Sequence, residues 1–149
     1  IRLFGAESGQ ECGTAALAYL GHRPGHKAEL TVLQNLRFSA RLHGADESML
    51  ECLIGTSGLG GLDDTPAAKL SAGQNKRLAL ARLQVQRSRL WLLDEPYANL
   101  DGAGIDWINA LVQTHTAAGG AALISTHGAY AAPQVPLRVL EIARSSADA

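Results

Sequence analysis

Two neighbouring stretches decide the fold: LSAGQNKRLALARL, from Leu70 to Leu83, and LWLLDEP, from Leu90 to Pro96. The first contains a Ser-x-Gly-Gln turn that leads into a basic helix. The second is a continuous apolar run, typical of a strand buried on both faces of a parallel sheet. It ends in two adjacent carboxylates, Asp94 and Glu95. Open α/β sheets bind ligands at the carboxyl ends of their strands, so these carboxylates stand where a site is expected.

The turn before the helix has two possible interpretations. Ser71 with Gln74 three residues later matches a capping box, which satisfies two backbone N–H groups at a helix start. A helix start also offers free N–H groups and a positive dipole end, which together attract phosphate. Gly73 has no Cβ, so an anion can approach the backbone closely. The residues alone leave open whether the turn is a cap only or also a phosphate site.

The carboxylate pair has a functional and a plain interpretation. Because side chains alternate on a strand, Asp94 and Glu95 point differently, and one could hold Mg²⁺ while the other polarises a water. The plain alternative is a strand that ends in a solvated acidic turn. His127 follows the apolar run LIST, which predicts another buried strand. If the two strands are parallel, His127 lies at the same sheet edge, where it could contact a γ-phosphate.

The remaining pattern predicts an α/β domain with a helical insertion. Strand, helix and strand follow one another from Leu90, which predicts a parallel βαβ unit. We expect an α/β core from residues 1–23 and 67–149 and a helical subdomain from residues 24–66. The other elements expected are a strand in 15–22, helices in 30–43 and from about Glu47, a helix in 104–118, and strands in 121–127 and 137–142.

Composition narrows the classes of protein. The 149 residues are 46% hydrophobic and 18% charged, which is typical of a globular domain. A net charge of −1 gives no electrostatic case for nucleic acid as the main partner. No apolar run reaches the roughly 18 to 20 residues of a membrane span, so any membrane association is expected to be peripheral. Cys12 and Cys52 form no metal or disulfide spacing, which favours a reducing compartment.

Four motifs in this order resemble the nucleotide-binding subunits of ABC transporters: LSAGQ, LWLLDEP, NLD at Asn99–Asp101 and STH at Ser125–His127. The resemblance implies a P-loop NTPase fold of the ABC type, α/β with a mostly parallel sheet and an inserted helical subdomain. It also implies ATP and Mg²⁺ as cofactors and a homodimer of ATPase subunits.

The resemblance implies a role for each matching residue. Glu95 would be the catalytic glutamate, His127 the switch histidine and Asp94 the magnesium ligand. The nucleotide-binding residues follow in the same way. Ser71 and Gly73 of the signature motif would contact ATP held by the opposite subunit, and Gln74 belongs to the same motif. Asp101 would be the D-loop aspartate at the dimer interface, and His22 would replace the glutamine that most members carry near the nucleotide.

Within the superfamily, the pattern Leu-Gly-His-x-Pro-Gly-x-Lys at residues 20–27 resembles the haem exporter ATPase of cytochrome c biogenesis. Two positions depart from that pattern: Gln34 where Glu is usual, and His26 where an apolar residue is usual. The resemblance implies ATP hydrolysis that powers haem export or delivery in cytochrome c maturation. It implies transmembrane permease subunits as partners and a peripheral position on the cytoplasmic face of the bacterial inner membrane.

One expected motif is missing from the printed sequence. It contains no G-x-x-x-x-G-K-[ST] loop, and the glycine-rich residues 5–14 lack the Lys-Ser/Thr pair. We therefore expect the chain to be the C-terminal part of a longer protein and to be inactive in ATP hydrolysis alone. Three alternatives stay open: an ABC ATPase for another substrate, a soluble ABC protein acting on DNA or ribosomes, and a non-catalytic pseudo-ATPase.

Overall fold

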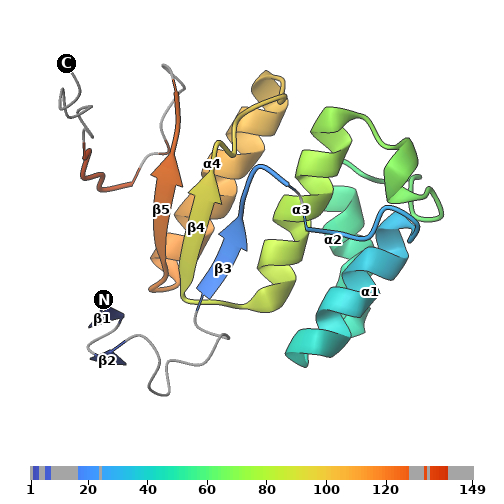
Figure 1. The fold of residues 1–149 in the computed structure, drawn as a ribbon, viewed down its shortest axis with the longest axis horizontal. Coiled ribbons are helices and arrows are strands. Elements are labelled where there is room, and N and C mark those ends of the chain that lie inside the picture. The colour runs from blue at the N-terminus through green and yellow to red at the C-terminus, as the bar shows by residue number, and fades with distance from the viewer. Residues whose placement is uncertain are drawn as a thin grey trace, which may run out of the picture.

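The computed structural model describes residues 17–23, 25–127, 133 and 135–140, and the backbone of residues 2–3 and 6–7. Cys12 and most of the glycine-rich residues 5–14 lie outside this part. A short hairpin pairs β1 (Arg2–Leu3) with β2 (Ala6–Glu7). The main sheet has three strands in the order β3-β4-β5 (Figure 1), which are Leu17–Leu20, Leu90–Asp94 and Ala121–Ser125.

All three strands of the main sheet run parallel, as the βαβ pattern predicts. Tyr19, Leu92 and Leu123 share one register row, and Asp94 lies beside Ser125 at the end of the β4–β5 pair. The carboxyl ends of the strands therefore meet at one edge of the sheet.

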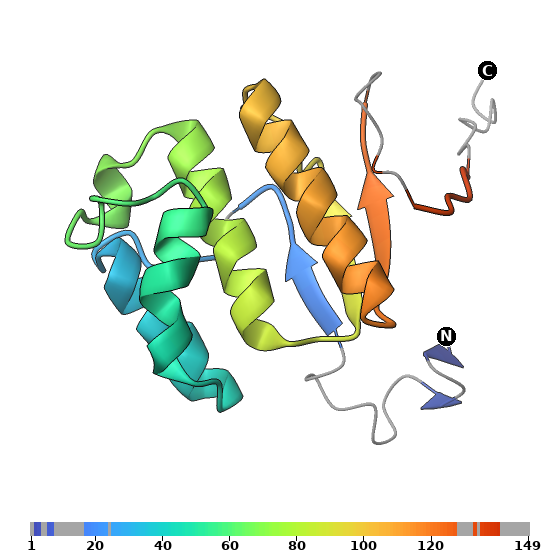
Figure 2. The ribbon, with the colours of Figure 1, turned by 180° about the vertical axis from the view of Figure 1, so that it is seen from behind.

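One face of this sheet is covered by helices. α4 (Gly102–Ala117) connects β4 to β5 and lies across the strands (Figure 2), with Ile108 and Val112 buried. It shares a hydrophobic core with α3 (Ala72–Gln86) and with the inward side chains of the strands, among them Trp91 and Leu93.

A second core holds the helical part together. It consists of α1 (Val32–His43), the 3₁₀ turn η2 (Glu47–Met49), α2 (Leu50–Thr56), the 3₁₀ turn η3 (Ala67–Lys69) and one side of α3. These helices lie beyond α3 from the sheet in both ribbon views. Of the described helices, none combines the length and apolar character that a membrane crossing needs.

α3 belongs to both cores. Leu78, Ala81 and Val85, on one side of the helix, are buried in the helical core. Leu80 and Leu83, on its other side, are buried against the sheet. A shift of α3 would therefore change the packing of both cores at once. The division into residues 24–66 and the remainder stays a prediction.

Two expectations about strands are wrong. β5 is a strand, but it is not buried on both faces, because Leu123 is 58% exposed on the face that no described helix covers. The strand expected at residues 137–142 is not formed by residues 137–140, and residues 141–142 lie outside the described part. No strand of the described residues pairs with 137–140, so their backbone groups lack the ladder partners that would hold them extended.

Candidate functional site

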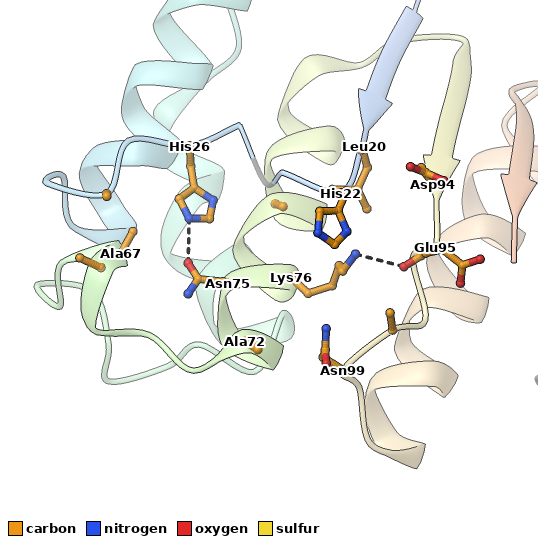
Figure 3. A pocket seen from close by; sticks show the side chains of 15 residues that line it. Leu20, His22, His26, Ala67, Ala72, Asn75, Lys76, Asp94, Glu95 and Asn99 are labelled. Carbon is orange, nitrogen blue, oxygen red and sulfur yellow. Dashed lines mark hydrogen bonds between the residues drawn. The ribbon is translucent and has the colours of Figure 1, made fainter. Parts of the chain in front are cut away.

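A cleft of about 530 Å³ lies between the carboxyl edge of the sheet and the first turns of α3 (Figure 3). His22, just after β3, lines it on one side, and Asp94 and Glu95 at the end of β4 line it on another. Asn75 and Lys76 contribute from α3. The parallel sheet thus brings together residues that are more than fifty positions apart in the chain.

Ser125, at the end of β5, holds both carboxylate residues. Its hydroxyl donates to Asp94 Oδ1 at 2.6 Å. The backbone N–H of Glu95 points at the Ser125 carbonyl oxygen, 3.1 Å away, and at its Oγ, 3.3 Å away. Sequence reasoning placed Ser125 in a motif without giving it a role. Its signal is the parallel register, which sets it beside Asp94.

Glu95 stands in an unusual conformation with a free carboxylate oxygen. Its φ is 47°, in the left-handed region that non-glycine residues seldom adopt. Within the described part of the chain, Glu95 Oε1 is buried and accepts no hydrogen bond. His127 Nε2 lies 3.6 Å from this oxygen, on a side chain that is 97% exposed. The parallel strands therefore place His127 at the expected edge, beside a carboxylate oxygen that no described group bonds.

Lys76 reaches Glu95 from the helix. Its Nζ donates to the backbone carbonyl oxygen of Glu95 at 3.0 Å (Figure 3). Burial lowers the pKa of Lys76, while the carboxylates of Asp94 and Glu95 act in the opposite direction. Sequence reasoning missed Lys76. The available signal was its helical spacing from Ala72, four residues earlier, which puts both on the face that lines the cleft.

The capping box expected at the start of α3 is formed. Gln74 N–H donates to Ser71 Oγ at 3.2 Å, and Ser71 N–H donates to Gln74 Oε1 at 2.9 Å. The first N–H groups of any helix have no intrahelical acceptor, so those of Ala72 and Gly73 can serve an outside acceptor. Ser71 is exposed and is not among the described residues that line the cleft. The cap is confirmed, and the phosphate site stays a prediction.

Asp101 caps α4 and pairs with an arginine of α3. Its Oδ1 accepts from Gly104 N–H at 2.9 Å and from Arg77 Nη2 at 3.1 Å, and its side chain is 71% exposed. Arg77 also donates to the Ser57 carbonyl oxygen at 3.2 Å and lies 5.8 Å from the centre of the Trp107 ring. Arg77 therefore joins α3 to the end of α2 and the start of α4.

His26 makes a polar bridge at a position where an apolar residue was expected. Its Nε2 lies 2.7 Å from Asn75 Oδ1, on the turn of α3 that lines the cleft. Burial lowers the pKa of His26, the hydrogen bond to Asn75 acts in the opposite direction, and nearby Arg82 lowers it further. This hydrogen bond connects the segment after His22 to α3.

The donor set fits magnesium bound together with a nucleotide. Among the described residues, no group of three or more His, Cys, Asp or Glu is placed to hold a metal ion. Mg²⁺ needs no such cage, because proteins commonly bind it through one or two carboxylates together with substrate phosphates and waters. The Asp94 carboxylate, oriented by Ser125 at the edge of the cleft, offers that kind of oxygen ligand.

A parallel α/β sheet with a carboxylate pair at its carboxyl edge and a capped helix start beside it is consistent with the P-loop NTPase class of α/β proteins. The ABC transporter family profile matches residues 8–98, and the chain belongs to this family.

Two curated relatives agree with the resemblance to the haem exporter ATPase of cytochrome c biogenesis. The "Cytochrome c biogenesis ATP-binding export protein CcmA" of Xanthomonas campestris pv. campestris (strain 8004) is 53% identical over 127 residues, which is 85% of this chain and 59% of the relative. The protein of the same name from Methylococcus capsulatus is 47% identical over 115 residues, 76% of this chain and 56% of the relative. The chain therefore spans somewhat more than half the length of these relatives.

Solved structures agree with the fold. One described as the ATP binding subunit of an ABC transporter superposes with a TM-score of 0.69 at 26% identity, over 76% of this chain and 49% of that one. The cbiO1 protein of Clostridium perfringens, part of the cbiONQ transporter complex, gives 0.61 at 28% identity, over 76% and 48%. The expected ABC-type α/β fold with a parallel sheet is confirmed.

Proposed function

We propose that this chain forms part of the ATP-binding and ATP-hydrolysing subunit of an ABC transporter that powers haem export or delivery in cytochrome c maturation. The observation that carries the proposal is the Asp94–Glu95 pair. Ser125 fixes both residues at the carboxyl edge, and the Glu95 side chain, which is 24% exposed, leaves part of its surface open to a water. Similarity to proteins named for cytochrome c biogenesis supports the substrate.

In this proposal Glu95 acts on a water. Its carboxylate orients the water and takes up its proton as the water oxygen attacks the γ-phosphorus of ATP. The bond from the γ-phosphorus to the bridging oxygen breaks, and ADP leaves with the bond's electron pair. His127, close to Glu95, would donate a hydrogen bond to the γ-phosphate. Asp94 would hold Mg²⁺, which supplies positive charge beside the phosphate oxygens.

The start of α3 would serve a second nucleotide, bound by the opposite subunit of a homodimer. Ser71 is exposed outside the cleft, and the N–H groups of Ala72 and Gly73 lie at the positive end of a helix of 15 residues. Gln74 would act through the cap rather than through direct contact, because its side-chain oxygen is bonded to Ser71. Asp101, exposed at the start of α4, would contact the dimer partner.

In the cell, the ATPase would bind transmembrane permease subunits. It would lie peripherally on the cytoplasmic face of the bacterial inner membrane. His22, which lines the cleft and precedes the helical part, would connect nucleotide and permease. The same names of relatives support this assignment.

A test in cells uses the protein translated from the complete reading frame. We expect it to copurify with permease subunits from detergent-solubilised membranes, and we expect a strain carrying Asp94→Asn to lose mature cytochrome c. Normal cytochrome c in that strain would point to another transported substrate. Retention of the protein on DNA at physiological salt, with no membrane partner, would favour a non-transport ABC protein.

A further inference from the structure

We propose that Lys76 is a positioning residue, which fixes the backbone of Glu95 and so couples the start of α3 to the carboxylate that acts on water. The proposal rests on the proposed function, because it assigns Lys76 a part in the same reaction. The observation behind it is the hydrogen bond from Lys76 Nζ to the Glu95 carbonyl oxygen, 3.0 Å long.

The backbone of Glu95 requires outside support. Its φ of 47° is unfavourable for a residue with a Cβ, and such conformations persist only where surrounding contacts enforce them. On the N–H side, Ser125 supplies the contacts. On the carbonyl side, Ala98 N–H donates at 3.3 Å and Lys76 Nζ at 3.0 Å. The bond from Lys76 is shorter than that from Ala98, and its donor is an ammonium.

The bond spans the cleft between two elements. Ala72, Asn75, Lys76 and Ala79 line the cleft from α3, and their spacing places them on one helix face. Lys76 is half-buried, so its ammonium has given up part of its water shell and relies on protein acceptors. Charge-assisted hydrogen bonds are stronger than neutral ones, so this contact can transmit a shift of the helix.

The consequence concerns the position of the carboxylate. The direction of the Glu95 side chain follows from its backbone angles, so release of the carbonyl lets the carboxylate turn away from the reacting water. Ser71 caps the start of α3. A nucleotide that attracts the first turn of this helix would therefore also move Lys76. Glu95 would therefore be best placed only when the helix start of the same subunit is engaged.

The test compares substitutions at Lys76 in the protein from the complete reading frame. Lys76→Met removes the donor and keeps the length, whereas Lys76→Arg keeps a charged donor. We expect Lys76→Met to lower kcat by about 10- to 100-fold with KM for ATP changed less than about 3-fold, as for a misplaced catalytic group. Lys76→Arg should recover most of the rate. Lys69→Met, at an exposed lysine before α3, is the matched control and should hydrolyse ATP normally.

Wild-type kcat in Lys76→Met would overturn the proposal. So would equal losses in Lys76→Met and Lys76→Arg with a proportional rise in KM, since that pattern indicates a role in binding. If Lys76→Met does not fold, as judged by thermal unfolding, Lys76→Leu, which also lacks a donor, takes its place with the same expectations.

A double substitution separates this proposal from the proposed function. Because Lys76 acts through Glu95, adding Lys76→Met to Glu95→Gln should lower the single-turnover rate no further. A multiplicative loss would overturn the role of Lys76. Failure of the proposed function gives a different result, namely wild-type hydrolysis by Glu95→Gln alone.

Discussion

Gly73 and Asn99 are in close contact: a Cβ added at Gly73 would lie 2.9 Å from the backbone carbonyl oxygen of Asn99. The start of α3 therefore packs directly against the loop that follows the carboxylate pair. Asn99 itself has a φ of 65°, which shows how tightly this loop turns. The glycine has a packing reason in addition to any approach of phosphate, and the contact joins two motifs that are separate in the sequence.

Gly73→Ala should destabilise the protein. The added methyl meets backbone rather than a flexible side chain, so the helix or the loop has to shift, and overpacking of this kind costs about 1 to 3 kcal/mol. Gly102→Ala is the matched control, since a Cβ there meets no atom of the described residues within 4 Å. Urea denaturation of both variants measures the effect, and equal free energies of unfolding would contradict the packing argument.

Ser125→Ala should weaken the use of magnesium. The substitution removes the hydroxyl that donates to Asp94 Oδ1 at 2.6 Å, while the backbone bond to Glu95 remains. Loss of a partner that orients a metal ligand commonly costs about 10- to 100-fold in metal affinity. The Mg²⁺ concentration for half-maximal ATP hydrolysis should rise accordingly, and Ser125→Thr, which keeps a hydroxyl, should stay closer to wild type. An unchanged Mg²⁺ dependence in Ser125→Ala would contradict the role of Ser125 in orienting Asp94 as a magnesium ligand.

Arg77→Gln should cost more stability than loss of a surface arginine. Arg77 is mostly buried and bonds to both Ser57 and Asp101, so its removal takes a donor from the Ser57 carbonyl and leaves Asp101 with Gly104 N–H alone, at a cost of about 1 to 3 kcal/mol. The control is Arg41→Gln, whose side chain is 74% exposed and pairs with Glu47. Exposed pairs contribute about 1 kcal/mol or less. Similar unfolding midpoints for the two variants would contradict the joining role of Arg77.

The sequence allowed prediction of features that depend on local spacing. The capping box of Ser71 and Gln74 and the parallel βαβ unit follow from short-range patterns, and both are present. The contacts of Ser125, Lys76 and Arg77 could not be predicted, because their partners lie 19 to 31 residues away and depend on register and helix rotation. A run of apolar residues also does not show whether one face or both faces of a strand are covered. The burial of β5 was wrongly predicted for this reason.

His26 should make stability depend on pH. Burial lowers its pKa in the folded protein below the ordinary value of 6.5, so below that value the unfolded chain binds more protons. The free energy of unfolding should therefore fall as the pH drops below 6.5. His26→Gln keeps an amide donor for Asn75 and should show a smaller fall. Identical pH profiles from about pH 8 to pH 5 would contradict this role.

The rate of ATP hydrolysis by Glu95→Gln, measured beside its affinity for ATP in the protein from the complete reading frame, tests the account most directly. Glutamine keeps the size of the side chain but cannot take up a proton from water. We predict a rate lower by about 100-fold or more with ATP affinity preserved, as for the loss of a general base. Hydrolysis at the wild-type rate would contradict the assignment of Glu95, and with it the site at the carboxyl edge of the sheet.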